Sequence, residues 1–396
     1  MPTAFPFIQW ILVISIALWP LHSAEAAREI KPSSLVLPAQ SEPLRWVRVA
    51  LAQDVPQVII DIQAAYRIHS SDGRELFRGN RMVGTRIEAT ADGIRIGPQV
   101  FFQSPITIHT DEGGIKLGGR LYRDSITLLH GKSGRLSVVN ALLLEDYLKG
   151  VLPIEVNPNW PFETLKAQAI ASRTYAIFKS LENRDAPFSM TRDVLSQVYA
   201  GKSAENSITS RAVDETAGQI LTYGGKIFPT YFHSTCGGKT TAAETNWDIA
   251  AHPSLRGVDC PFCQGTKHYR WEGEFSVAEI QEALKKNGFA LSRLEDVTPV
   301  DLDASGRAQN FLIRFDGKSK KLRANDLRLW LDPFRLRSTF FRHFGRSGNT
   351  FQMTGRGWGH GAGMCQWGSE KLGELGYSHS QILDYYYPDA QVRNLV

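Results

Sequence analysis

Val151-Leu152-Pro153-Ile154-Glu155-Val156 sets one carboxylate among apolar neighbours, just ahead of a long helical segment. Burial removes hydration from a carboxyl group, disfavours its charged form and so raises its pKa. A glutamate in such a setting stays protonated near neutral pH and can act as a general acid toward a glycosidic oxygen. Glu155 is therefore the first candidate for a catalytic residue.

The segment that follows predicts a helix over Pro161–Phe178, because apolar residues recur at helical spacing: Leu165, Ala169, Ile170, Ala176 and Ile177. Arg173 falls on the same apolar stripe. A buried charge needs a partner, which is either a carboxylate or an anionic substrate. We therefore predict that Glu155 and Arg173 form the catalytic pair, with Arg173 as the orienting or substrate-binding partner. The alternative is an ion pair between the two that only stabilises the core.

Residues 1–27 are predicted to be an export signal. Residues 7–21 are mostly apolar, and Ala24-Glu25-Ala26 offers small residues for cleavage. The apolar run is short for a membrane span, which needs roughly 20 residues. No Lys or Arg precedes Arg28, so a retained N-terminal membrane anchor is the competing hypothesis. In both cases the protein is expected to be exported, to the periplasm, the cell wall or the extracellular space.

The composition is that of a folded protein with two or three domains. The chain has 396 residues, of which 42% are hydrophobic and 21% charged. The net charge of +5 suits an anionic polymer such as a cell wall. Lys and Arg form no concentrated tract, so the sequence indicates no nucleic-acid partner.

The order of patterns along the chain predicts an α+β fold. Proline-rich residues 28–44 are predicted to be a linker, and alternating strand patterns broken by turns predict a β-rich N-terminal domain over 45–139. Residues 140–396 are expected to form the catalytic region. In it, a helical section at 141–175 is inserted between strand-rich halves and a glycine-rich motif follows near the C-terminus.

Four segments in order resemble the stage II sporulation protein D family (SpoIID/LytB): Glu145–Glu155, Lys166–Tyr175, Tyr231–Thr240 with Trp247 after it, and Gly355–Gly368. The resemblance implies a peptidoglycan lytic transglycosylase in some members and an enhancer of cell-wall amidases in others. The family's catalytic glutamate matches Glu155, and its arginine on the next helix matches Arg173. The implied substrate is a glycan strand, with a preference for strands that have lost their stem peptides. A cell-wall amidase is the alternative partner.

One carboxylate is enough for this chemistry. Ordinary glycosidases need an acid and a second carboxylate as base or nucleophile. A lytic transglycosylase uses the C6 hydroxyl of muramic acid as an internal nucleophile and closes a 1,6-anhydro ring, which is entropically favoured. We expect Glu155 to protonate the leaving oxygen and then accept the hydroxyl proton. This route requires no cofactor.

The resembling segments also supply candidate substrate contacts. His233 ends a predicted strand beside two glycines that allow a tight turn, and the glycine-rich motif carries tryptophans that suit sugar faces. For His233, Trp358 and Trp367 the alternative is a structural role in the core. The predicted substrate-binding set is His233, Gly237, Gly238, Thr240, Tyr199, Trp358, His360 and Gln366.

The chain has four cysteines, and two of them have the spacing of zinc ligands, Cys260-Pro261-Phe262-Cys263. Cys236 and His268 are the candidates to complete a structural zinc site. The alternatives are two disulfides, Cys260–Cys263 with Cys236–Cys365, or a redox-active pair. The resemblance also implies, for some members, a zinc site before a Cys-Gln-Val-Tyr segment. The matching residues 193–199 contain neither Cys nor His, so we expect no metal there.

Overall fold

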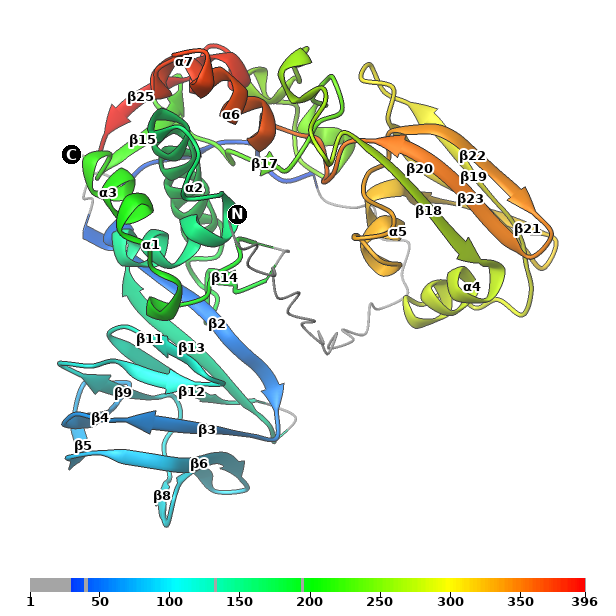
Figure 1. The fold of residues 1–396 in the computed structure, drawn as a ribbon. Coiled ribbons are helices and arrows are strands. Elements are labelled where there is room, and N and C mark those ends of the chain that lie inside the picture. The colour runs from blue at the N-terminus through cyan, green and yellow to red at the C-terminus, as the bar shows by residue number, and fades with distance from the viewer. Residues whose placement is uncertain (1–29, 39–41, 132–133, 194–195, 396) are drawn as a thin grey trace, which may run out of the picture.

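A computed structural model describes residues 30–38, 42–131, 134–193 and 196–395 (Figure 1). The predicted export signal lies outside these residues. The predicted α+β class is confirmed, since helices and several sheets alternate along the chain. None of the described helices combines the length and the apolar character needed to cross a bilayer.

Two sheets form the β-rich scaffold. The larger sheet has the order β14-β2-β13-β12-β9-β4-β5, and the second has the order β11-β10-β3-β6-β7-β8. The strands are β2 (Trp46–Val55), β3 (Gln57–Ile62), β4 (Tyr66–Ser70), β5 (Glu75–Gly79), β6 (Met82–Thr90), β7 (Gly93–Ile96), β8 (Gln99–Phe101), β9 (Ile106–Thr110), β10 (Ile115–Leu117), β11 (Arg120–Tyr122), β12 (Ser125–His130), β13 (Leu136–Leu143) and β14 (Met190–Thr191). Their alternating burial follows the two-residue period of the sequence.

Three helices follow β13 in the chain: α1 (Leu144–Glu155), α2 (Phe162–Glu182) and α3 (Ser207–Glu215). Of these, α1 begins at the residue directly after β13. The helix predicted over Pro161–Phe178 is confirmed and extends four residues further, to Glu182. Residues of both sheets and of the three helices share one apolar core, which includes Ile60, Leu128, Tyr147 and Leu165. The β-rich part and the helical section are therefore packed as one body.

The segment predicted as a linker, 28–44, is partly structured. Its residues Leu35–Val36 form β1, which pairs with β16 (Lys226–Ile227) in a sheet with β15 (Gln219–Tyr223) and β25 (Gln391–Asn394). Lys31 also makes backbone hydrogen bonds to the 248–250 loop. Within the predicted linker, Lys31 and Leu35–Val36 thus find backbone partners on the body.

A second apolar core joins α2 to the C-terminal segments. These are β17 (Phe232–His233), β24 (Met364–Cys365), α6 (Gln366–Glu374) and α7 (His379–Tyr386). Short 3₁₀ helices lie at Glu42–Arg45, Lys202–Ala204, Ala243–Thr245, Pro253–Leu255 and Pro261–Cys263. β17 and β24 pair in parallel, with His233 opposite Cys365. This pairing brings two of the resembling motifs side by side.

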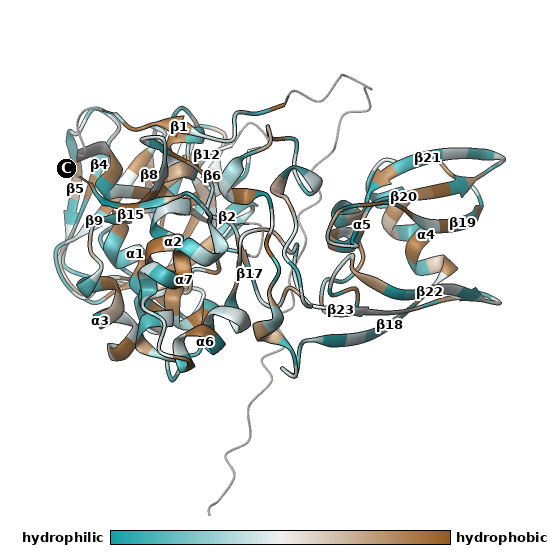
Figure 2. Ribbon diagram, turned by 90° about the horizontal axis from the view of Figure 1, so that it is seen from above, coloured by the Kyte–Doolittle hydropathy of each residue, from teal (hydrophilic) through white to brown (hydrophobic). Residues whose placement is uncertain are grey.

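Residues 270–356 form a lobe that projects from the body (Figures 1 and 2). Its elements are β18 (Arg270–Ser276), α4 (Val277–Lys286), β19 (Leu294–Leu302), β20 (Ala308–Phe315), β21 (Lys318–Arg323), α5 (Ala324–Trp330), β22 (Phe341–Ser347) and β23 (Thr350–Arg356). The lobe has its own apolar core, drawn from residues between Trp271 and Met353. The sequence indicated a strand near Phe311–Phe315 but did not separate this lobe from the region 140–396.

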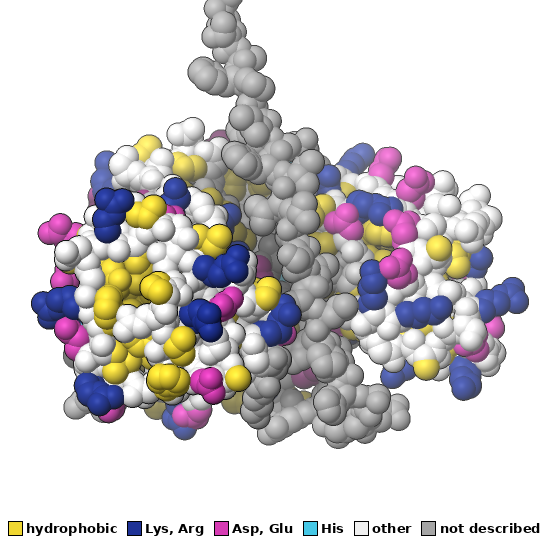
Figure 3. All heavy atoms as spheres, turned by 90° about the horizontal axis from the view of Figure 1, so that it is seen from below, with side chains coloured by type: hydrophobic (Ala, Val, Ile, Leu, Met, Phe, Trp, Pro, Cys, Tyr) yellow, Lys and Arg dark blue, Asp and Glu magenta, His cyan; other side chains and the backbone are white. Residues whose placement is uncertain are grey.

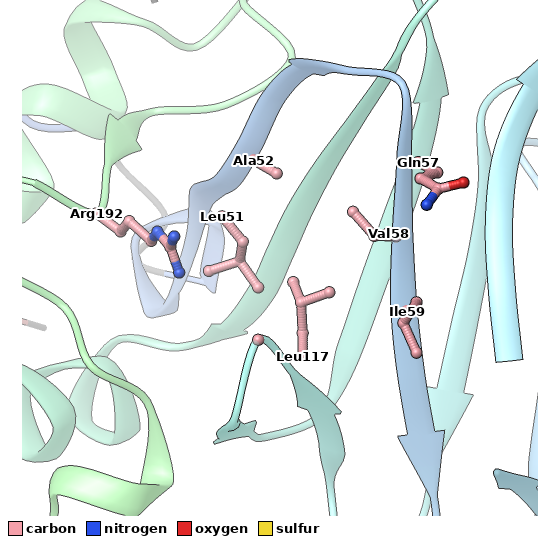
Figure 4. A pocket seen from close by; sticks show the side chains of 8 residues that line it. Leu51, Ala52, Gln57, Val58, Ile59, Leu117 and Arg192 are labelled. Atoms are coloured by element: carbon pink, nitrogen blue, oxygen red, sulfur yellow. The ribbon is translucent and has the colours of Figure 1, made fainter. Parts of the chain in front are cut away.

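Hydrophobic side chains gather on the outer face of the β-rich scaffold (Figure 3). A hollow of about 370 Å³ lies in this part of the molecule, between β2, β3 and β10 (Figure 4). Leu51, Val58, Ile59 and Leu117 line it, with Arg192 at one side. None of the predicted site residues lines this hollow, so the candidate site has to be sought elsewhere.

Candidate active site

Glu155 is the last residue of α1, and its carboxyl group is held by the protein. The Val198 amide donates a hydrogen bond to Oε1 at 2.8 Å, and Gln366 Nε2 donates to the Glu155 carbonyl at 3.2 Å. Burial raises the pKa of the Glu155 carboxyl, and the hydrogen bonds from Val198 and Gln366 oppose that rise only in part. The residue as a whole keeps partial solvent exposure, while its carboxyl group is buried. This is the setting of a carboxyl group that stays protonated above its ordinary pH range.

Arg173 does not pair with Glu155. Its side chain is fully buried and binds Glu145 in a bidentate manner, with Nε to Oε1 at 2.8 Å and Nη2 to Oε2 at 2.7 Å. Glu145 and Glu155 stand at opposite ends of α1, ten residues or about 15 Å apart along a helix. The predicted direct pairing of Arg173 with Glu155 is therefore wrong, whereas a catalytic role for Arg173 stays a prediction. The sequence pattern placed Arg173 on the buried stripe but could not say which carboxylate it meets.

Gln366 lies beside the carboxylate, although we predicted it as a substrate contact. Its side chain is almost fully buried at the first position of α6, within 3.5 Å of Gln168 Oε1. Gln168 in turn donates to Ser172 Oγ at 3.1 Å, so Gln366 of α6 is linked through Gln168 to a second polar side chain of α2. Sequence reasoning missed Gln168 and Val198. Gln168 was visible as a polar residue within an apolar helix, whereas a backbone amide such as that of Val198 leaves no signal.

A row of partly exposed aromatic rings includes Trp367, the residue after Gln366. We call it the aromatic row: Trp160, Trp367, His268 and Trp358. Successive ring centroids are 5.2, 5.9 and 4.6 Å apart. The row ends at the joint with the projecting lobe, where Trp358 Nε1 donates to the Pro333 carbonyl at 3.1 Å. Flat apolar rings with polar edges suit the C–H faces of sugars. Trp358 was predicted here, whereas Trp160 was missed because a lone tryptophan in a loop shows no pattern.

His233 and His360 belong to a second aromatic cluster. Tyr231 stacks on Trp247 at 3.8 Å, and His360 lies 4.9 Å from Trp247 and 5.5 Å from His233. Burial lowers the pKa of His233 to about 3 and also lowers the pKa of His360. Both rings are therefore neutral at physiological pH. His233 Nδ1 lies 3.0 Å from the Ala362 carbonyl, while its Nε2 is buried without a partner among the described residues.

Tyr199 and Thr240 are structural in this protein, which corrects their prediction as substrate contacts. Tyr199 is buried, and its hydroxyl donates to Asn140 Oδ1 at 2.9 Å. The buried Thr240 hydroxyl accepts from the Val258 amide at 2.7 Å. In both cases the buried hydroxyl group makes a hydrogen bond within the protein. Neither side chain is therefore free to contact a substrate beside Glu155.

The predicted tight turn at Gly237 and Gly238 is present. Both glycines have positive φ angles, +78° and +119°. At Gly237 an added Cβ would lie 2.7 Å from the Cβ of Arg356. Gly237 is thus required by the close contact between two backbone segments rather than by a ligand.

Gly363 offers a sharper test of how closely the motifs are packed. Its φ is +66°, and an added Cβ would lie 1.9 Å from the Tyr231 carbonyl oxygen. Gly376 has a similar φ of +83° with nothing within 4 Å. We expect Gly376→Ala to cost roughly 1–2 kcal/mol of unfolding free energy from the left-handed conformation alone. Gly363→Ala should cost clearly more, and equal losses in urea unfolding would contradict this packing.

All four cysteines converge in the second apolar core. Cys236, Cys260, Cys263 and Cys365 are buried, none is in a disulfide, and their sulfur atoms lie within 4.8 Å of one another. His268, which we predicted as a ligand, belongs to the aromatic row instead. Cys365 takes its place because the pairing of β17 with β24 brings Cys365 close to Cys236. The sequence spacing identified only the pair Cys260 and Cys263.

Comparison with known proteins agrees with the resemblance. Residues 132–223 match a family model described as stage II sporulation protein, and residues 259–363 match a domain of unknown function. An uncharacterized protein of Brachyspira hyodysenteriae is 35% identical over 296 residues, covering 74% of this chain and 78% of the relative. Stage II sporulation protein D of Bacillus subtilis is 32% identical over 64% of this chain and 75% of its own length.

A more distant relative carries a different name. The amidase enhancer of Bacillus subtilis is 27% identical over 61% of this chain, which corresponds to 39% of that protein. The identity and coverage of the first relatives, together with the matching family model, settle the family. The chain belongs to the stage II sporulation protein D family.

Proposed function

We propose that this protein is an exported peptidoglycan lytic transglycosylase that cleaves the bond between N-acetylmuramic acid and N-acetylglucosamine. The observation that carries the proposal is the state of Glu155, a partly exposed residue whose carboxyl group is buried and has its pKa raised by that burial. Membership of the stage II sporulation protein D family supports a role at the cell wall. The proposed substrate is a glycan strand without stem peptides.

The reaction needs one proton carrier. Protonated Glu155 gives its proton to the glycosidic oxygen as the bond to muramic acid C1 breaks, and the glucosamine end leaves with a free hydroxyl group. The muramic acid C6 hydroxyl then attacks C1 and passes its proton to the Glu155 carboxylate. This step closes the 1,6-anhydro ring and restores the acid, with no water consumed. Within the described part of the chain, no second carboxylate figures among the groups that shift the pKa of Glu155.

Residues around Glu155 orient its carboxyl group and offer surfaces that can bind the glycan strand. The Val198 amide and the Gln366 side chain hold the carboxyl group and its helix end in place. The aromatic row, whose neighbouring rings meet edge to face at 68–71°, offers separate ring surfaces to a glycan strand and includes Trp367, next to Gln366. A series of aromatic rings of this kind suits a polymeric substrate, whose successive sugars each present an apolar C–H face.

The second candidate function is enhancement of a cell-wall amidase without catalysis. It is favoured by one observation, the name of the Bacillus subtilis relative, amidase enhancer. In that case Glu155 would have no chemical role, and the aromatic row would serve only to bind glycan. The two functions differ in whether new glycan ends are formed.

The test is incubation of the purified protein with denuded glycan strands, followed by mass spectrometry of the soluble products. We expect fragments that end in 1,6-anhydro-muramic acid. Binding of strands without any fragment would overturn the proposal and favour the enhancer function. Fragments with ordinary reducing ends would instead show hydrolysis by an activated water.

The raised pKa of Glu155 also predicts how stability changes with pH. A carboxyl group whose folded pKa lies above its unfolded value stabilises the fold at low pH, and this contribution is lost as the pH rises through the folded pKa. Glu155→Gln removes the buried charge. The variant should therefore gain thermal stability relative to wild type at pH 8 and lose that advantage at pH 4, as followed by circular dichroism. A difference that does not change with pH would contradict the raised pKa.

A further inference from the structure

The cysteine cluster brings together three segments that are far apart in the sequence. Cys236 follows β17, Cys260 and Cys263 flank a 3₁₀ turn, and Cys365 ends β24. All four side chains are fully buried, and their sulfur atoms lie within 4.8 Å of one another. Four sulfur atoms at 2.3 Å from a common centre, as in a zinc tetrathiolate, would stand just under 4 Å apart. The observed cluster therefore has the size of a tetrahedral thiolate site.

Hydrogen-bond donors surround these sulfur atoms. The amides of Cys236 and Gly368 donate to Cys365 Sγ at 3.2 and 3.3 Å, and the Gly238 amide donates to Cys236 Sγ at 3.4 Å. The Tyr386 hydroxyl lies 3.1 Å from Cys260 Sγ. Thiols that merely fill a core need no such donors, whereas thiolates that ligate a metal are oriented and stabilised by them.

A buried positive charge lies next to the cluster. Four thiolates around a divalent ion leave a net negative charge, which is costly to bury unless it is compensated. Arg307, from the projecting lobe, is almost fully buried and donates to the Cys236 and Lys239 carbonyls, the latter at 2.8 Å. Cys236, Cys263 and Cys365 interact electrostatically with its guanidinium. The lobe thus supplies the counter-charge that a tetrathiolate site needs.

We propose that Cys236, Cys260, Cys263 and Cys365 bind one structural zinc ion. A set of four sulfur donors in tetrahedral arrangement selects zinc or iron, and no ligand position is left open for a substrate. The ion ties the turn after β17 and the 260–263 loop to the start of α6. Because Cys365 directly precedes Gln366, the metal fixes the helix end that contacts Glu155. The inference stands whether or not the proposed lytic activity is correct.

Disulfides are the competing arrangement in an exported protein. The sulfur atoms of Cys236 and Cys263 are 3.3 Å apart, well beyond the roughly 2.05 Å of a disulfide bond. This close pair also differs from the pairing that the sequence suggested, Cys260–Cys263 with Cys236–Cys365. Four sulfurs gathered around one centre fit a shared ligand better than two separate bonds.

The experiment measures metal and thiols on the purified full-length protein. Elemental mass spectrometry should find one zinc per chain, and four free thiols should be counted in denaturant once a chelator is added. Reconstitution of the chelated protein with Co²⁺ alone should give the visible absorption of tetrahedral cobalt–thiolate. A protein without metal whose intact mass shows two disulfides would overturn the proposal, as would stoichiometric iron in place of zinc.

Variants separate the ligands from their neighbours. Cys263→Ser should lose the bound zinc or hold it with lower affinity in a chelator competition, and its unfolding temperature should fall. His268→Ala should keep one zinc per chain, since the imidazole lies outside the cluster. Loss of zinc in His268→Ala would contradict the four-cysteine site. The cobalt spectrum of the wild type decides the matter if Cys263→Ser does not fold.

Discussion

Glu155→Gln is expected to lower the rate of glycan-strand cleavage by about 10²–10⁴-fold, the usual contribution of general acid–base catalysis. Glutamine keeps the shape of the side chain and can still accept the hydrogen bond from the Val198 amide. It has no proton to give to the glycosidic oxygen, so only the chemical step is removed. The measurement is the initial rate of release of 1,6-anhydro ends from denuded strands, with binding of strands measured in parallel.

Glu374→Gln is the matched control for this variant. Glu374 ends α6, the helix that carries Gln366, but its carboxylate faces solvent in a surface pair with Lys371 at 2.7 Å. The control should cleave at the wild-type rate. Wild-type turnover by Glu155→Gln would exclude the mechanism, while an equal loss in both variants would point to a disturbed α6 rather than to lost chemistry.

The pH profile provides an independent check on the same residue. A general acid must be protonated in the free enzyme, so kcat/KM should fall as the pH rises through the pKa of Glu155. Because burial raises that pKa, the fall should occur above the range of an ordinary glutamate. A profile whose rate falls near pH 4 would mean that Glu155 is not the acid.

The sequence predicted features that depend on residues close together in the chain, and it did not predict contacts between distant segments. The apolar run around Glu155 and the helical spacing after it are local, and both the raised pKa and α2 follow from them. The partner of Arg173 depends on how two helices pack, and a stripe of apolar residues does not encode it. The contact between Gln366 and Glu155 joins residues 211 positions apart. Such a contact arises from the fold as a whole.

The projecting lobe was likewise not predicted, because its boundaries depend on contacts between distant segments. Its strands and helices have ordinary patterns, and nothing in composition marks the points near residues 270 and 356 where the chain leaves and rejoins the body. The two points are adjacent only because β18 pairs with β23, with Arg270 opposite Arg356. The lobe interrupts the sequence between Cys263 and Cys365, which is why the spacing of the cysteines suggested His268 instead of the fourth sulfur.

Arg173→Met is expected to cost roughly 1–3 kcal/mol of unfolding free energy, because the Val213 and Gln219 carbonyls lose their donor and the Glu145 carboxylate, 32% exposed, loses its partner. The guanidinium is fully buried and also donates to the Val213 and Gln219 carbonyls at 3.2 and 3.1 Å. Methionine can fill the space of the stem but satisfies none of these acceptors. Urea unfolding measures the loss.

Arg123→Met is the comparison for an arginine that is itself partly exposed. Arg123 binds Glu205 with the same bidentate geometry, at 2.7 and 2.6 Å, but its side chain is 29% exposed. Solvent screens such a pair, so its loss should cost no more than about 1 kcal/mol. An equal loss of unfolding free energy in the two variants would contradict the conclusion that burial makes the Arg173 interactions stronger.

The double variant Arg173→Met/Glu145→Gln separates a structural role from a catalytic one. Neutralising Glu145 removes the unpaired charge while the amide oxygen can still accept the bond from the Gly218 amide, so the double variant should be more stable than Arg173→Met alone. If Arg173 only holds α1 against α2, the folded double variant should cleave glycan with a KM and kcat close to those of the wild type. A kcat that falls while stability recovers would return Arg173 to the catalytic role that the family resemblance implies.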